Sequence, residues 1–229
     1  LGDLLLSSLP TTLRKGKPIP KPKTETGHNN SPAYQLTKDQ HHAIEAVDQT
    51  ANQFRCFLLQ GVTGSGKTQV FSELIDRMIK RGQQILLLVP EIGLTGQMVS
   101  RIQDQLDGEL CVSHSGIADG ARTKAFIASA RGVADVMIGT RSALFTPMPN
   151  LGLILVDEEH DGAYKNQEGC RYSARDLAIV RAKQMKIPIV LSSATPSLET
   201  WQQAELGKYQ RIRLSARPRQ QPQQTISLI

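Results

Sequence analysis

The stretch that decides the fold is Gly-Val-Thr-Gly-Ser-Gly-Lys-Thr at residues 61–68. It fits the pattern G-x-x-x-x-G-K-[ST], in which a glycine-rich backbone turns its N–H groups toward a phosphate. An apolar run at 54–59 precedes this loop. The segment that follows the loop is expected to end at Gly82, a residue that commonly terminates helices. That segment carries an apolar stripe at helical spacing, made by Phe71, Leu74, Ile75, Met78 and Ile79. The sequence therefore predicts a strand, a phosphate-binding loop and a helix.

Strand-like and helix-like segments alternate after this loop. Short apolar runs predict strands at 85–89, 133–138, 153–156 and 189–191, and the segment 209–214 is also strand-like. Helices are predicted between them at 95–106, 119–129, 174–185 and 196–206, with Ser173 capping the third. This alternation predicts an α/β fold, a mostly parallel sheet with helices on both faces.

The second chemical motif is Asp157-Glu158-Glu159-His160, which ends an apolar strand 90 positions after Lys67. Together with the loop it indicates a P-loop NTPase, and hence ATP and Mg²⁺ as ligands. Lys67 would reach the β- and γ-phosphates, and Thr68 with Asp157 would hold the metal. Glu158 would orient or deprotonate a water. The remaining nucleotide contacts are assigned to Gly61, Thr63, Gly64, Ser65 and Gly66. The alternatives are a chance glycine-rich turn and a surface acidic cluster.

Composition narrows the class of protein. The net charge is +6, of which residues 14–23 contribute +5 with no acid among them, so +1 remains for the rest. A uniformly basic surface is not indicated, and the run is either a solvated linker or a contact with phosphates. The cysteines (Cys56, Cys111 and Cys170) lie far apart, which argues against a zinc site or disulfides and fits a reducing cytoplasm. No apolar run reaches the roughly 18–20 residues that span a bilayer.

The chain divides into four segments. Residues 1–13 are expected to be the tail of a preceding domain, which docks on the main domain or belongs to a neighbour that is missing. Residues 14–34 form a basic, proline-rich linker. Residues 35–215 form the ATP-binding domain, and 216–229 begin a connection to a second lobe.

Several strings resemble the motifs of the DEAD/DEAH-type superfamily 2 helicases. Residues 157–160 look like motif II, 193–195 (Ser-Ala-Thr) like motif III, 90–95 like motif Ia and 139–143 like motif Ib. Gln40 stands where these enzymes place an adenine-reading glutamine, although an exposed helical glutamine is the alternative. The resemblance implies a RecA-like motor lobe that uses ATP and Mg²⁺.

Longer strings resemble one branch, the primosomal replication-restart helicases. They are His-Ser-Gly at 114–116, Ile-Gly-Thr-Arg-Ser-Ala-Leu-Phe-Thr-Pro at 138–147, and the segments 164–169 and 171–178. The resemblance covers about residues 35–215. It implies movement from 3′ to 5′ on single-stranded and forked DNA, with other primosome proteins and single-strand-binding protein as partners. The motor lobes of restriction or remodelling enzymes share the general motifs, but would not predict 164–176.

The resemblance makes 161–172 an aromatic-rich loop that couples DNA binding to hydrolysis. Tyr164 and Tyr172 would stack on bases, or alternatively pack within a lid, and Lys165 and Arg171 would meet phosphates. Cys170 replaces a tryptophan that is usual in the family, so we expect weakened coupling.

Further DNA contacts follow from motifs Ia and Ib. Thr95 and Gln97 would donate to one strand, and Arg141 would bind a phosphate or serve as an ion-pair partner. Ser193 and Thr195 would relay the nucleotide state between the lobes, with a helix cap as the competing role for Thr195. His160 is assigned to the same group of DNA-binding or coupling residues.

In this family a second lobe supplies arginines to the γ-phosphate and carries zinc-binding cysteines. The sequence ends soon after motif III, so we expect a fragment, an excised piece or a decayed copy. Such a chain is expected to bind Mg²⁺ and ATP but to hydrolyse poorly. The alternative function is an ATP-regulated module that binds DNA or a partner without unwinding.

Overall fold

A computed structural model describes residues 9–16, 35–94, 96–104, 106, 108–167 and 169–214. Most of the predicted linker and all of the predicted connection at 216–229 lie outside these residues. Within them, no helix is both long and apolar enough to cross a membrane.

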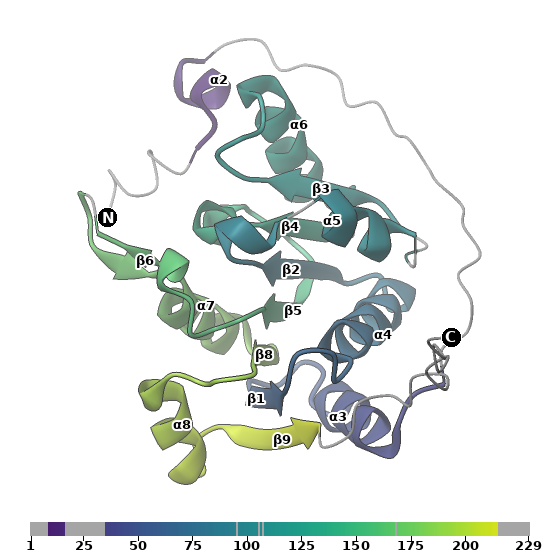
Figure 1. Cartoon of the computed structure of the whole chain (residues 1–229). Helices are drawn as coiled ribbons and strands as arrows, with labels where there is room; N and C mark the ends of the chain where they lie inside the picture. The colour runs from purple at the N-terminus through teal and green to yellow at the C-terminus, as the bar shows by residue number, and fades with distance from the viewer. Residues whose placement is uncertain are drawn as a thin grey trace, which may run out of the picture.

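A seven-stranded parallel sheet forms the centre of the domain, in the order β3-β4-β2-β5-β8-β1-β9. Figure 1 shows it with β3 near the top and β9 at the bottom. The strands are β1 (Cys56–Gly61), β2 (Gln84–Leu88), β3 (Leu110–Ser113), β4 (Val136–Gly139), β5 (Leu151–Val156), β8 (Ile189–Ser193) and β9 (Gln210–Leu214). Because β1 pairs with both β8 and β9, and β5 with β2 and β8, the loops after these strands meet at one edge.

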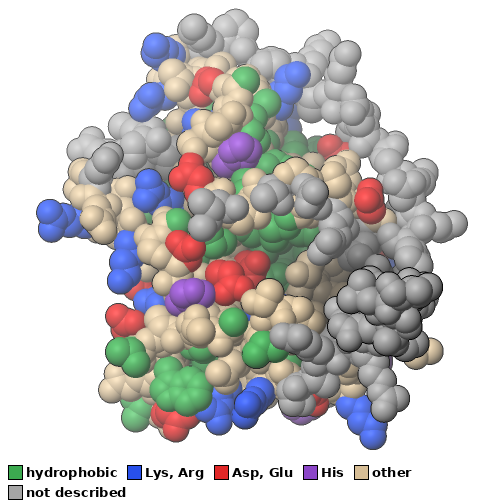
Figure 2. Space-filling view, viewed as in Figure 1, with side chains coloured by type: hydrophobic (Ala, Val, Ile, Leu, Met, Phe, Trp, Pro, Cys, Tyr) green, Lys and Arg blue, Asp and Glu red, His purple; other side chains and the backbone are tan. Residues whose placement is uncertain are grey.

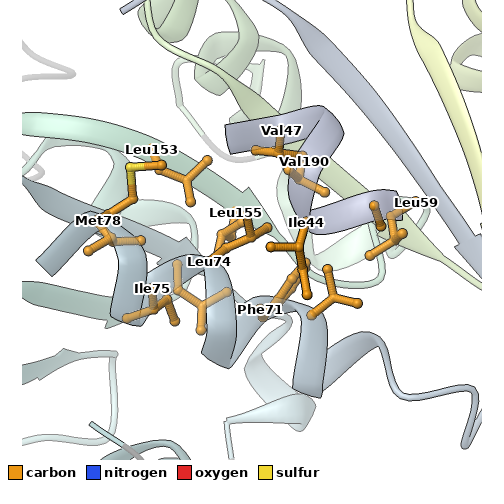
Figure 3. Packing of buried hydrophobic residues seen from close by; sticks show 14 of the residues in the cluster. Ile44, Val47, Leu59, Phe71, Leu74, Ile75, Met78, Leu153, Leu155 and Val190 are labelled. Carbon is orange, nitrogen blue, oxygen red and sulfur yellow. The ribbon is translucent and has the colours of Figure 1, made fainter. Parts of the chain in front are cut away.

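Helices cover both faces of the sheet, as predicted. One face packs against α3 (Lys38–Asp48), α4 (Lys67–Lys80) and α5 (Gly96–Gln103). The other packs against α6 (Asp119–Ala130), η2 (Arg141–Phe145) and α7 (Ala174–Met185). In Figure 3, Leu74 of α4 and Ile44 of α3 point toward Leu155 and Val190 of the sheet. These buried contacts fix the helix that follows the phosphate-binding loop.

Some elements differ from the prediction. Strand β3 is missing from it, because four half-buried residues that include Cys111 and Ser113 carry no clear periodicity. The 3-10 turn η1 (Glu91–Gly93) precedes α5, which ends before Leu106. The aromatic-rich stretch contains η3 (Gly162–Tyr164) and an antiparallel pair, β6 (Lys165–Asn166) and β7 (Tyr172–Ser173). Helix α8 (Leu198–Glu205) begins after Ser197, whose side chain accepts from the Thr200 N–H. Thr195 is therefore not its N-cap.

The described part of the N-terminal segment docks on the main domain. Helix α2 (Thr11–Arg14) lies on α6, and the Asp119 carboxylate accepts from the Thr11 N–H at 2.8 Å and the Thr12 N–H at 2.9 Å. The Thr12 hydroxyl donates to the same carboxylate at 2.7 Å. For these residues, docking on the main domain is the alternative that the structure bears out.

Candidate nucleotide site

The loop between β1 and α4 has the backbone that a phosphate-binding loop needs. Gly64 and Gly66 adopt φ of +81° and +87°, a region that residues with a Cβ rarely enter. A Cβ on Gly66 would lie 2.0 Å from Nε2 of Gln40, whereas one on Gly64 would meet nothing within 4 Å. Position 66 therefore favours glycine both because of its positive φ and because a side chain would clash with Gln40. Position 64 favours glycine because of its positive φ alone.

Lys67 joins the two motifs that the sequence places 90 residues apart. Its Nζ donates to the Gly61 carbonyl at 2.8 Å and lies 3.4 Å from Oε1 of Glu158. The cation thus lies between the loop and the carboxylate predicted to act on water.

Asp157 follows directly on β5 and is held by β8. The Ser192 hydroxyl donates to Oδ1 of Asp157 at 2.5 Å. Burial raises the pKa of Asp157 above its ordinary value, although the Ser192 hydrogen bond and the charge of Lys67 act in the opposite direction. A carboxylate that is poorly solvated in this way gains more from a bound cation than an exposed one would.

Glu158 and His160 continue the motif in unusual geometry. Glu158 has φ of +44°, a conformation that costs a residue with a side chain on the order of 1–3 kcal/mol and is typical of functional sites. Nδ1 of His160 lies 3.6 Å from Oε2 of Glu158 and 2.8 Å from Oγ of Ser193. Oγ of Ser193 also accepts from the Thr195 N–H at 3.0 Å. The Asp-Glu-Glu-His and Ser-Ala-Thr segments are therefore in direct contact.

Gln40 is buried against the phosphate-binding loop, with a relative exposure of 1%. Its Oε1 accepts from the Thr37 N–H at 2.8 Å, and its Nε2 donates to the Ser65 and Gly66 carbonyls at 3.3 and 3.5 Å. The alternative of an exposed helical glutamine is wrong. An adenine-reading role stays a prediction, since both ends of the amide already have partners.

The residues present fit a nucleotide. Oγ of Ser65 is buried and has no hydrogen-bond partner among the described residues, so a donor is left over inside the loop. Thr63 and Gly64 are exposed at its mouth and Thr68 is partly exposed. Among the described residues, no three or more His, Cys, Asp or Glu side chains are placed so that together they could hold a metal ion. Mg²⁺ does not need one, because it is commonly held by one or two protein oxygens, waters and substrate phosphates. Figure 2 shows acidic side chains near the middle of the view, with a histidine beside them.

The structure places Tyr164 inside the domain. The ring is 2% exposed, and its hydroxyl donates to the Asp157 carbonyl at 2.6 Å, with the Leu88 carbonyl 3.0 Å away. Stacking of this ring on a base does not fit that placement. Packing, the alternative reading, does, and it puts the tyrosine directly behind the magnesium-binding candidate.

The other coupling candidates lie nearer the surface. Tyr172 is half-buried and meets Phe145 edge-on, with ring centroids 5.5 Å apart. Nη1 of Arg141 donates to the Lys165 carbonyl at 3.2 Å, and its contact with a DNA phosphate stays a prediction. Lys165 and Arg171 are exposed. Their contacts with DNA stay predictions.

A cavity of about 210 Å³ lies beside these residues at the ends of β2 and β4. Its lining includes Glu91, Ser115, Arg122, Thr140, Arg141 and Ser142.

Thr95 lies outside the described residues, and the side chain of Gln97 is not among the described ones. Their predicted contacts with a DNA strand therefore stay predictions.

Glu159 is a residue that sequence reasoning missed. It is 1% exposed and forms an ion pair with Arg175, Oε2 to Nη1, at 3.0 Å. Three acids in succession after a strand end gave no signal to separate an inward from an outward carboxylate. The only hint was Arg175, a basic residue next to Ala174 in the predicted helix 174–185.

Comparisons with known proteins agree with this geometry. The family model described as DEAD/DEAH box helicase matches residues 37–204, so the chain belongs to that family. Among solved structures, RecG bound to a three-way DNA junction has a TM-score of 0.57 at 22% identity, over 93% of this chain and 29% of that one. A hypothetical ATP-dependent RNA helicase from Sulfolobus tokodaii has a TM-score of 0.56 at 18% identity, over 93% and 57%. These likenesses show the RecA-like fold.

Relatives in sequence include replication restart proteins. The chain is 49% identical to PriA of Haemophilus influenzae over 72% of this chain and 22% of that protein. It is 39% identical to PriA of Bacillus subtilis, over 85% and 24%. The chain is a PriA-like first helicase lobe, and it spans about a quarter of the length of these relatives.

Proposed function

We propose that the chain is the ATP-binding motor lobe of a PriA-like DNA helicase that moves from 3′ to 5′ and acts in restart of stalled forks. The observation that carries this proposal is the contact of Lys67 with both the Gly61 carbonyl and Glu158. A lysine so placed can exchange its carboxylate for the γ-phosphate when Mg²⁺ and ATP bind.

The residues have separate roles in this proposal. The loop N–H groups and Lys67 would bind the phosphates, and Thr68 with Asp157 would hold Mg²⁺, which would offset the phosphate charge. Glu158 positions the attacking water and accepts its proton. The arginines of a second lobe are worth about 10³–10⁵ in turnover in related phosphoryl-transfer systems. The described lobe alone is therefore expected to bind nucleotide and hydrolyse it near the background rate.

The partners follow from the same reading. Single-stranded and forked DNA would meet Arg171, Lys165 and the segments beside the cavity at β2 and β4. Other primosome proteins and single-strand-binding protein are proposed partners because the relatives are named replication restart proteins. The cytoplasm is the proposed location.

Two titrations test the proposal. Binding of a fluorescent ATP analogue with Mg²⁺ is expected for the wild type and lost in Lys67→Ala, with folding unchanged by circular dichroism. No binding by the folded wild type would overturn it. Turnover stimulated by DNA to the level of an intact helicase would overturn the expectation of weak hydrolysis.

The second titration separates the motor lobe from the alternative. Labelled single-stranded DNA is titrated with and without a non-hydrolysable ATP analogue. Nucleotide-dependent affinity, with no strand separation when the chain is joined to a second motor lobe, would favour the ATP-regulated binding module. Strand separation in that fusion supports the motor.

A further inference from the structure

Glu159 is the centre of a buried polar cluster behind the nucleotide site. Its Oε1 accepts from the Ser197 N–H at 2.7 Å. Its Oε2 accepts from Arg175 at 3.0 Å, from the Thr200 hydroxyl at 2.8 Å and from the Ser197 hydroxyl at 3.1 Å. Both oxygens thus have donors, which a buried carboxylate requires.

The cluster joins segments that are distant in sequence. Glu159 follows Glu158, and its N–H donates to the Ser192 carbonyl of β8 at 2.9 Å. Ser197 is the N-cap of α8 and lies two residues after Thr195. Glu159 therefore links the start of α8 to the end of β5. The Ser-Ala-Thr segment, residues 193–195, lies in the chain between its two partners, Ser192 and Ser197.

Arg175 connects this cluster to α7. The guanidinium, in a residue that is 8% exposed, donates through Nη1 to Glu159 and to the Ser197 hydroxyl at 2.8 Å, and through Nε to Asp176 at 2.8 Å. Helix α7 begins directly after Tyr172 and Ser173, the last strand of the aromatic-rich stretch. Arg175, which belongs to α7, thus links the helix that follows the aromatic-rich stretch to Glu159, the carboxylate next to Glu158.

Holding two helices together by a buried ion pair costs free energy, because both charges lose their contact with water. Replacing a buried ion pair by apolar residues is often neutral or stabilising, so stability alone is a weak reason for it. What an ion pair supplies, and apolar packing does not, is a fixed register between particular atoms. Here the cluster fixes the position of α8 relative to Glu158 and to Ser193, the residue that His160 contacts.

We propose that Glu159 and Arg175 are positioning residues that hold the Ser193–Thr195 segment and α8 in register with Glu158, so that nucleotide binding at the loop moves α8. The inference rests on the proposed function, since it needs a nucleotide at Lys67. It goes further in naming the path by which that site reaches the outer helix.

The chain carries its own reporter. Trp201 is the single tryptophan, it lies on α8 one residue after Thr200, and Cζ of Arg211 is 4.8 Å from its ring centroid. A displacement of α8 relative to β9 changes this contact and therefore the tryptophan emission. Emission is measured with and without a saturating non-hydrolysable ATP analogue and Mg²⁺, while a displacement titration gives the nucleotide Kd separately.

The variants separate positioning from stability. Glu159→Gln keeps the shape but turns an amide NH₂ toward existing donors, and Arg175→Met removes the charge. Thr200→Val is a milder change that removes one donor. Arg181→Met is the matched control, because Arg181 also projects from α7 but donates to the Leu144 and Thr146 carbonyls and not to Glu159.

The expected result is a clear emission change in the wild type and in Arg181→Met. Glu159→Gln and Arg175→Met should lose at least about three quarters of it with Kd within about threefold of the wild type, which is well under the tenfold that 1.4 kcal/mol represents. Thr200→Val should lose part of the emission change. Arg175→Lys should show part of the emission change that Arg175→Met loses. The double variant should be no worse than either single one.

Three outcomes would overturn the inference. One is a wild-type lobe that binds nucleotide without any emission change. Another is a full emission change in the folded fraction of Thr200→Val and of either charge variant, which would make the cluster purely structural. The third is an equal loss in Arg181→Met. Absence of nucleotide binding by the wild type would instead overturn the proposed function, and the Kd measurement distinguishes that case.

Discussion

Gly66→Ala is expected to destabilise the fold clearly more than Gly64→Ala, although both substitutions add the same methyl group to the same loop. Both glycines have φ above +80°, so alanine at either position costs roughly 1–2 kcal/mol of conformational energy. Only at position 66 does the new Cβ fall 2.0 Å from Nε2 of Gln40. That distance is too short for any contact, so the Gln40 side chain must leave.

The extra cost follows from what Gln40 then loses. Its amide donates to the Ser65 and Gly66 carbonyls and accepts from the Thr37 N–H, which closes a capping box at the start of α3. At about 0.5–1.5 kcal/mol for each hydrogen bond, and with the longer two at the low end, the loss is about 1–3 kcal/mol. Gly66→Ala should therefore lower the free energy of unfolding by about 2–5 kcal/mol, and Gly64→Ala by about 1–2 kcal/mol.

Urea unfolding followed by circular dichroism measures both values in the absence of nucleotide, so that ligand binding does not enter. The matched test is a double-mutant cycle with Gln40→Ala. Gln40→Ala removes the group that clashes, so adding Gly66→Ala to it should cost only the conformational term. Equal destabilisation by the two glycine variants, or additivity of Gly66→Ala with Gln40→Ala, would refute this reasoning.

Three further predictions concern other parts of the domain. Tyr164→Phe should lower the free energy of unfolding by about 0.5–1.5 kcal/mol in urea unfolding and leave affinity for single-stranded DNA unchanged, because the buried hydroxyl donates to the Asp157 carbonyl and the ring is not exposed; a large loss of DNA affinity would contradict it. Hydrogen bonds from α2 lower the pKa of Asp119 to about 2, so this docking is complete above pH about 4 and is lost as the pH falls toward 2. Amide exchange at Thr11 measures it, and Asp119→Asn should show fast exchange at every pH, whereas protection retained in that variant would exclude the carboxylate as the anchor. Leu74→Ala should cost about 2–5 kcal/mol, since the side chain is fully buried between α4 and the sheet, and a loss below 1 kcal/mol in urea unfolding would show that the core collapses around the cavity.

The central fold was predictable because its signals are local and mutually consistent. An apolar stripe at helical spacing specified α4, and short apolar runs specified five of the strands in the sheet. Strand β3 was not predictable, since Leu110–Ser113 is half-buried and its pairing with β4 comes from a distant residue range. The Asp119 anchor of α2 could not be found either, because it joins residues more than 100 positions apart.

The candidate site divides in the same way. Lys67, Thr68, Asp157 and Glu158 belong to motifs whose spacing is set by the chemistry of phosphate and metal, so their proximity to the phosphate-binding loop and to one another could be predicted from the sequence, and their roles stay predictions. Glu159 could not, because its role depends on a guanidinium and two hydroxyls brought in by other segments. A motif identifies the groups that face a ligand and says little about the groups that hold the motif from behind.

The outcome for Tyr164 shows why an aromatic residue near a motif does not by itself indicate a base-stacking surface. The carbonyl ends of parallel strands need donors where the sheet stops, and the hydroxyl of Tyr164 reaches the carbonyls of Leu88, at the end of β2, and Asp157, just past β5. Its ring is buried among apolar residues on that face of the sheet. Tyr172, which is half-buried and edge-on to Phe145, has no such buried acceptor among the residues that the structure describes and keeps part of its surface accessible. If DNA reaches this stretch, Tyr172 is the ring that can meet it, and Tyr164 can respond only by moving the strand end that carries Asp157.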